Sequence, residues 1–248
     1  MQKKQHPSAA QSTADSSAGS VEMRIIARIR SDFPTKFGIP RQSGLVESLQ
    51  ATVVFEPPYR NPDALRGLSG YSHLWLIWQF SESVRQGWSP TVRPPRLGGN
   101  RRMGVFATRS PFRPNAIGLS CVKIANIEPD SPVGPVIHIL GADLMDGTPI
   151  LDLKPYLPHA DCKPEATGGF STPLVDDALQ VKCPQELLLR LPEQHRQTLL
   201  DLLAQDPRPS YQHDPNRVYG FPFAGFEIRF SVQNEVLLVR EIIPEPSK

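Results

Sequence analysis

The run His73-Leu74-Trp75-Leu76-Ile77-Trp78-Gln79-Phe80 is the most hydrophobic strand that the sequence predicts. It holds two tryptophans and no turn residue, which is typical of a β-strand covered on both faces, as in a closed barrel or a subunit interface. His73 stands at one end of this run. It can act as a proton carrier there, although a hydrogen-bonded structural histidine is commoner, and both roles stay open.

Further short strands are predicted on both sides of this run. They cover residues 22–30, 51–55, 103–108, 117–127, 135–140 and 149–153. Turns rich in proline and glycine separate them, and the 27 prolines of the chain exclude long helices from most of its first two-thirds. About seven short strands without helices between them favour a small antiparallel β-barrel or sandwich, because closure removes unpaired strand edges.

The pattern changes beyond a loose segment that contains Gly168-Gly169. Leucines recur at helical spacing between residues 187 and 203, and residues 223–232 and 235–243 indicate a hairpin joined by Gln233-Asn234. We therefore expect a mainly β chain. Its parts would be a disordered extension at 1–20, a β-barrel domain at 21–160, a linker at 161–172 and a small α+β domain at 173–248.

Composition indicates an ordinary soluble protein of 248 residues, with 39% hydrophobic residues and a mean hydropathy of −0.30. No apolar run approaches the roughly 18 residues of a membrane helix, and residues 1–20 lack the hydrophobic core of a signal peptide. Cys121, Cys162 and Cys183 are too far apart for a metal or redox pair. We expect reduced thiols, a cytoplasmic location, and neither a metal nor a membrane partner.

Eight basic residues and no acidic one lie between Glu82 and Glu128. They are Arg85, Arg93, Arg96, Arg101, Arg102, Arg109, Arg113 and Lys123. The arginines stand among prolines and glycines, which is loop chemistry rather than the pattern of a solvated helix face. Since a rigid scaffold often presents binding residues on loops, this segment predicts a site for an anionic ligand.

Several motifs follow one another along the first two-thirds of the chain. They are Phe37-Gly38-Ile39-Pro40-Arg41-Gln42, Tyr71-Ser72-His73-Leu74-Trp75, Arg93-Pro94-Pro95-Arg96-Leu97-Gly98-Gly99-Asn100, Gly104-Val105-Phe106-Ala107-Thr108-Arg109-Ser110-Pro111-Phe112-Arg113-Pro114-Asn115-Ala116-Ile117-Gly118-Leu119-Ser120, and Asp146-Gly147-Thr148-Pro149 with Leu153-Lys154-Pro155-Tyr156. In sequence, order and spacing they resemble the TsaA/TrmO (YaeB-like) family. The match is strong over residues 22–160 and weaker towards the C-terminus.

The resemblance implies an S-adenosylmethionine-dependent tRNA (adenine(37)-N6)-methyltransferase, which methylates N6 of threonylcarbamoyladenosine next to the anticodon. It also implies a β-barrel in place of a Rossmann sheet, and a homodimer. No GxGxxG loop occurs in the chain. Glu56-Pro57-Pro58-Tyr59 is therefore better explained as a strand terminator than as the amine-binding motif of Rossmann methyltransferases.

The resemblance also assigns residues to the cofactor S-adenosylmethionine. They are Pro40, Arg41, Gln42, Arg109, Leu119, Asp146, Gly147, Thr148 and Pro149. Arg109 is suited to clamp the cofactor carboxylate, Leu119 to pack on its adenine, and Asp146 to accept from its ammonium or a ribose hydroxyl. We expect the remaining arginines to bind the phosphates of the anticodon arm and the threonylcarbamoyl carboxylate; these are Arg93, Arg96, Arg101, Arg102 and Arg113. The catalytic residue stays unknown.

The segment Asp206-Pro207-Arg208-Pro209-Ser210-Tyr211 resembles the tail motif of the family, in which Arg208 and Tyr211 are suited to contact RNA. A simple helix stop explains its prolines equally well. Two other functions stay open, a non-catalytic RNA-binding β-barrel and a methyltransferase with another substrate. The motifs Asp146-Gly147-Thr148-Pro149 and Pro40-Arg41-Gln42 favour a cofactor site, because a pure RNA binder has little use for an acid in an anion-binding mouth. The Pro40-Arg41-Gln42 segment can also be read as an exposed basic turn.

Overall fold

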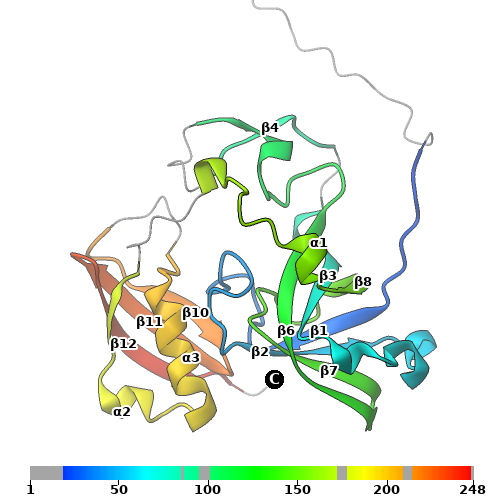
Figure 1. Cartoon of the computed structure of the whole chain (residues 1–248). Helices are drawn as coiled ribbons and strands as arrows, with labels where there is room; N and C mark the ends of the chain where they lie inside the picture. Colours follow the sequence, from blue (N-terminus) through cyan, green and yellow to red (C-terminus); the bar gives the residue numbers. More distant parts are fainter. Residues whose placement is uncertain (1–18, 85–86, 95–100, 172–177, 209–213, 247–248) are drawn as a thin grey trace, which may run out of the picture.

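The computed structural model describes residues 19–84, 87–94, 101–171, 178–208 and 214–246. Six antiparallel strands close into a barrel in the order β1-β2-β7-β6-β3-β8 (Figure 1). They are β1 (Ala27–Ser31), β2 (Gln50–Phe55), β3 (His73–Gln79), β6 (Ile117–Ser131), β7 (Gly134–Leu140) and β8 (Pro149–Pro155). The predicted fold class, a mainly β chain with a closed barrel, is confirmed. The predicted extension at 1–20 lies mostly outside the described residues.

Strand β3 shows how the barrel core forms. Leu74, Leu76 and Trp78 point to the same face and are buried, whereas the alternate residues of the strand are half-buried. They pack with residues from the other strands, such as Ile29, Val53 and Ile137, into one core. The outer face of this strand keeps partial contact with solvent in the single chain, so of the two predicted covers the barrel provides only the inner one, and cover by a second subunit stays a prediction.

The loops between the strands are built from short pieces. Four 3-10 helices, η1 (Pro57–Tyr59), η2 (Pro62–Leu65), η3 (Leu68–Gly70) and η4 (Ser81–Ser83), flank β3. The predicted strand at 103–108 is wrong in length, since β5 (Met103–Gly104) pairs only with β4 (Thr91–Val92) and leads into η6 (Val105–Ala107). The reason is local: the Thr108 hydroxyl donates to the Val105 carbonyl at 2.8 Å and closes a turn.

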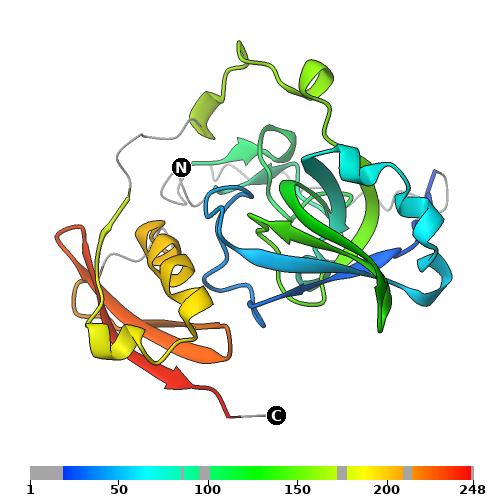
Figure 2. The same ribbon diagram turned by 60° about the horizontal axis from the view of Figure 1, so that its bottom comes forward.

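The C-terminal part carries a second sheet in the order β10-β11-β12-β9. After α1 (Pro158–Asp161) and η7 (Gly169–Ser171) come β9 (Gln180–Lys182), α2 (Gln185–Leu188), α3 (Glu193–Ala204), β10 (Tyr219–Phe223), β11 (Phe226–Gln233) and β12 (Val236–Pro244). The two predicted helices are present, and each of α2 and α3 begins directly after a proline. The predicted hairpin is present as β11 and β12, but its predicted first strand begins too early, because Phe223 ends β10 and the chain turns at Ala224-Gly225 with positive φ. The hairpin turn lies at Asn234-Glu235, one residue beyond the predicted Gln233-Asn234. Figure 2 shows α3 against the sheet.

The second core also contains residues from the first part of the chain. Phe33, Val46 and Leu49 are buried among side chains of α3 and of the second sheet. The backbone N–H of Ala224 donates to the Asp32 carbonyl at 3.0 Å. The segment between β1 and β2 therefore joins the barrel to the C-terminal sheet. No helix within the described ranges is long and apolar enough to cross a membrane.

Candidate functional site

A cavity of about 800 Å³ opens at one end of the barrel. Its wall is formed by the loop after β1, the end of β3 with η4, the loop from η6 to β6, the first residues of β6, and the turn before β8. Most of its lining surface is apolar. A concave, largely apolar surface with a few charged groups is the usual form of a small-molecule site.

Six of the predicted cofactor residues line this cavity: Pro40, Arg41, Gln42, Arg109, Leu119 and Thr148. The Arg109 guanidinium donates from Nη1 to Gln42 Oε1, and the Gln42 amide donates to the Arg41 carbonyl. Two motifs that are far apart in the sequence thus meet at one wall. Arg109 is exposed, and its guanidinium has further donors besides the one that Gln42 accepts from.

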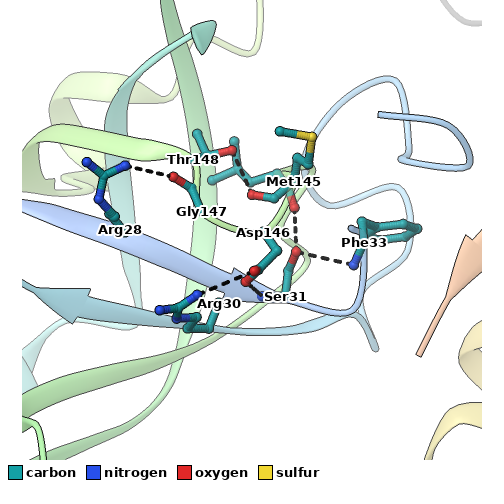
Figure 3. Close-up of polar contacts among 9 residues, drawn as sticks. Arg28, Arg30, Ser31, Phe33, Met145, Asp146, Gly147 and Thr148 are labelled. Carbon is teal, nitrogen blue, oxygen red and sulfur yellow. Dashed lines mark hydrogen bonds and ion pairs between the residues drawn. The ribbon is translucent and has the colours of Figure 1, made fainter. Parts of the chain in front are cut away.

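The turn from Asp146 to Pro149 is arranged differently from the expectation (Figure 3). The Asp146 carboxylate accepts from the Ser31 backbone N–H at 3.1 Å and from Arg30 at 3.4 Å. Arg28 donates to the Gly147 carbonyl at 3.3 Å. Asp146, Gly147 and Pro149 do not line the cavity, while Thr148 does. Within the described chain these contacts tie the turn to β1, and a cofactor role for the three residues stays a prediction.

Apolar side chains surround the mouth of the cavity. Leu119 is 54% exposed and its strand neighbour Ile117 is 37% exposed, and both line the cavity. Phe106 lines it as well and is 72% exposed, with its ring 6.1 Å from that of Trp88. Exposed apolar groups of this kind are suited to pack on a flat ring.

Asp143 is a site residue that the sequence predictions missed. It lines the cavity and accepts a hydrogen bond from the Ser120 hydroxyl at 2.6 Å, while Ser120 accepts from the Trp78 indole N–H at 3.0 Å. Burial raises the pKa of the Asp143 carboxyl above its usual value, whereas the Ser120 hydrogen bond, backbone N–H groups and the charge of Arg109 act in the opposite direction. The one sequence signal was its position three residues before Asp146.

The predicted RNA-binding arginines have different surroundings. Arg93, Arg101 and Arg102 are exposed beside β4 and β5, so they are free to approach a phosphate. Arg113 is half-buried, lines the cavity and donates to the Thr108 carbonyl at 3.1 Å. The side chain of Arg96 lies outside the described residues.

In the C-terminal part, Arg208 is already paired. Its Nε and Nη2 atoms lie 2.7 and 2.8 Å from the two carboxylate oxygens of Asp206, and its side chain is 11% exposed. The pair supports the helix-stop interpretation of this motif, since the guanidinium fork is occupied. Tyr211 lies outside the described residues. The Nδ1 atom of His73 shares a hydrogen bond of 2.8 Å with the Ser72 hydroxyl. His73 does not line the cavity, which fits a structural role.

Fold and site together define the class of protein, a small-molecule-binding β-barrel. Its cavity is lined by several basic residues and by one half-buried acid, Asp143. The chain belongs to the tRNA-methyltransferase O family. The family model described as the tRNA-methyltransferase O N-terminal domain matches residues 28–162, and that of the TrmO C-terminal domain matches residues 176–245.

Relatives and solved structures agree with this assignment. A protein of Escherichia coli K12 named tRNA (adenine(37)-N6)-methyltransferase is 44% identical over 86% of this chain and 94% of its own length. One of the same name from Eikenella corrodens is 45% identical over 70% of this chain and 97% of its own length. A crystal structure of TrmO from Pseudomonas aeruginosa superposes with a TM-score of 0.71 at 31% identity, covering 90% of this chain and 99% of the other.

Proposed function

We propose that the chain is a tRNA (adenine(37)-N6)-methyltransferase, which transfers a methyl group from S-adenosylmethionine to N6 of threonylcarbamoyladenosine next to the anticodon. The observation that carries the proposal is the cavity in which Gln42 and Arg109 meet. Family membership and the name shared by the relatives support the reaction. A relative from Pseudomonas aeruginosa, 42% identical over 79% of this chain and 85% of its own length, carries a provisional name as an S-adenosylmethionine-dependent methyltransferase.

The residues of the cavity fit the chemistry of that cofactor. Arg109 would pair with its carboxylate, because a guanidinium matches a carboxylate with two parallel hydrogen bonds. Leu119 and Ile117 would pack on its adenine ring, and Arg41 and Gln42 would hold its polar groups. When bound, S-adenosylmethionine supplies an electrophilic methyl group on a sulfonium.

Positioning is the main task of the protein in such a reaction. The exposed apolar residues at the mouth would exclude water, and the loop with Pro40-Arg41-Gln42 would fix one reactant against the other. Holding two reactants in a near-attack geometry is worth on the order of 7–11 kcal/mol in an ideal case. The pairing of Gln42 with Arg109 supports this, since it links two loops before any ligand binds.

The tRNA partner is supported by the exposed arginines Arg93, Arg101 and Arg102 on one side of the barrel. We propose that they contact phosphates of the anticodon arm, and that residues 173–248 contribute to the same contact. A cytoplasmic location follows from a tRNA substrate. We also propose a homodimer, because Phe106 and Trp88 leave apolar surface uncovered that a second copy would bury. Light scattering on a sizing column tests the dimer.

Methylation of mixed tRNA, followed by nucleoside mass spectrometry, tests the reaction. We expect a mass gain of one methyl group on threonylcarbamoyladenosine and on no other nucleoside. Calorimetric titration with S-adenosylmethionine distinguishes the alternatives. Binding of tRNA without the cofactor would indicate a non-catalytic RNA-binding barrel, and binding of the cofactor without methylation of tRNA would indicate another substrate.

A further inference from the structure

Trp78, Ser120 and Asp143 form a hydrogen-bonded chain that leads from the barrel core into the cavity. Trp78 and Ser120 are buried, and Asp143 lies at the cavity wall. The indole N–H is a donor only, so the Ser120 oxygen must accept from it. The hydroxyl proton is therefore directed to the Asp143 carboxylate, which fixes the direction of the whole chain.

The sequence is adapted to this arrangement. A Cβ atom at Gly118 would lie 2.2 Å from the Trp78 indole, so glycine is needed on β6 beside the ring. Gly118 and Ser120 both belong to the motif from Gly104 to Ser120, whose last residues form the start of β6. The function proposed above uses neither of them for cofactor binding. A buried indole, a buried hydroxyl and a space-making glycine thus all serve to hold one carboxylate. Leaving a buried polar group without its hydrogen bond is costly, so the two hydrogen bonds of this chain hold the carboxylate in one orientation.

Among the described residues that line the cavity, Asp143 is the best candidate for a proton acceptor. The charged residues among the described lining are Lys36, Arg41, Glu82, Arg109, Arg113 and Asp143. Glu82 is exposed, and no histidine, cysteine or tyrosine belongs to the described lining. Asp143 is therefore the one acid of that lining that is withdrawn from solvent and held by fixed donors.

We propose that Asp143 is a catalytic residue that accepts the N6 proton of threonylcarbamoyladenosine during methyl transfer. This inference rests on the function proposed above. As the nitrogen forms its bond to the methyl carbon, the carbon–sulfur bond breaks and its electron pair stays on sulfur. The N6 proton passes to a carboxylate oxygen of Asp143 and then to solvent. In threonylcarbamoyladenosine N6 is conjugated with both the purine and the carbamoyl carbonyl and is a weak nucleophile, so an acceptor for its one hydrogen raises its reactivity.

Ser120 and Trp78 are positioning residues in this scheme. The hydrogen bond from Ser120 stabilises the ionised carboxylate, which is the form that accepts a proton. It opposes the effect of burial, which raises the pKa of the Asp143 carboxyl. Without Ser120 the carboxyl would remain protonated to a higher pH.

The decisive variant is Asp143→Asn, because asparagine keeps the shape and can still accept from Ser120. Single-turnover methylation of tRNA is measured across pH with saturating S-adenosylmethionine, and cofactor affinity is measured by calorimetry. We expect the rate to fall by about 10²-fold or more, with cofactor affinity within about threefold, a change small against the roughly tenfold that 1.4 kcal/mol represents. In the wild type the methylation rate should fall at low pH as Asp143 becomes protonated, which gives the plot of rate against pH an acidic limb. This limb should disappear in the variant. Thermal unfolding of the variant checks its fold.

A matched control is Asp32→Asn. Burial also raises the pKa of Asp32, whose partner is His195 at 3.4 Å, but Asp32 does not line the cavity. This variant should leave the acidic limb in place. Ser120→Ala should move the limb to higher pH. A uniform loss of rate without that shift would contradict the role of Ser120.

Two results overturn the proposal for Asp143. One is a rate for Asp143→Asn equal to that of the wild type. The other is a loss of cofactor affinity with an unchanged rate at saturation, which would make Asp143 a binding group for the cofactor cation. If the wild-type protein itself does not methylate tRNA, the proposed function fails instead, so the two failures are distinguishable.

Discussion

The rings of Phe33 and Phe223 pack against each other with centroids 5.4 Å apart, and both side chains are buried. Phe33 follows β1 of the barrel, whereas Phe223 ends β10 of the C-terminal sheet. The loop that begins beside Phe33 carries Pro40-Arg41-Gln42 to the cavity. The second sheet therefore supports one wall of the candidate site through this contact.

Phe33→Ala should destabilise the protein by about 3–5 kcal/mol, the usual cost of removing a buried aromatic side chain and leaving a cavity. Chemical denaturation followed by far-ultraviolet circular dichroism measures the change. Phe37, four residues further on, is 57% exposed and provides the control. Phe37→Ala should change stability by no more than about 0.5 kcal/mol. Equal effects of the two substitutions would show that the Phe33 contact contributes little.

Gly38→Ala should weaken cofactor binding as well as stability. Gly38 has a φ of +82°, and a Cβ there would lie 2.2 Å from the Phe221 ring, so the loop must move away from the C-terminal sheet. Gly44 has a φ of +79° and no atom within 4 Å of the added Cβ. Gly44→Ala therefore has only the backbone strain, roughly 1–2 kcal/mol. Calorimetry should show reduced S-adenosylmethionine affinity for Gly38→Ala alone.

The sequence predicts the barrel well because its strands are short, apolar and separated by proline and glycine turns. The two helices and the hairpin follow from leucine spacing and from the turn at Asn234, where the structure has positive φ at Asn234 and Glu235. Strand β9 was missed, because three residues paired in parallel with β12 leave little local signal. The packing of Phe33 on a sheet formed far along the chain is also invisible to local patterns.

Motifs identify the wall of the cavity but not the direction of each side chain. Pro40, Arg41, Gln42 and Arg109 were predicted and do line it. Asp146 faces β1 instead, since it accepts from the Ser31 N–H, and Asp143 takes its place at the cavity. The two acids lie three residues apart, and the groups that hold them, the Ser31 N–H for Asp146 and the Ser120 hydroxyl for Asp143, come from strands distant in the sequence, so no local pattern shows which acid faces the cavity.

Arg109 should dominate cofactor affinity over the arginines outside the cavity. Loss of one partner from a charged hydrogen bond typically costs roughly 1.5–3 kcal/mol, or about ten- to hundredfold in affinity. Arg109→Lys should be nearly as damaging as Arg109→Ala, because lysine cannot bond a carboxylate with two parallel donors. Arg101→Ala is the control, since Arg101 is exposed and does not line the cavity. Wild-type affinity in both Arg109 variants would exclude it as the carboxylate clamp.

Asp143→Asn should make the unliganded protein less sensitive to pH. Burial raises the pKa of the Asp143 carboxyl in the folded state. The carboxyl therefore contributes to folding stability when it is protonated. This contribution is fully present below the pKa that Asp143 has in the unfolded chain, and it is lost as pH rises through its pKa in the folded protein. Above that window the variant should therefore be more stable than the wild type, and thermal unfolding from pH 4 to 8 measures the difference. A variant less stable than the wild type at pH 8 contradicts this expectation.

The salt dependence of tRNA binding should distinguish the exposed arginines from the paired one. Each phosphate contact contributes about 0.7 to 0.9 to the slope of log affinity against log salt concentration. Arg93→Ala, Arg101→Ala and Arg102→Ala should each lower the slope by about that amount, because the side chains are exposed. Arg208→Ala should leave it unchanged, since Asp206 already neutralises that guanidinium. Filter binding at several salt concentrations measures the slopes. A reduced slope for Arg208→Ala alone would instead assign the RNA contact to the C-terminal motif.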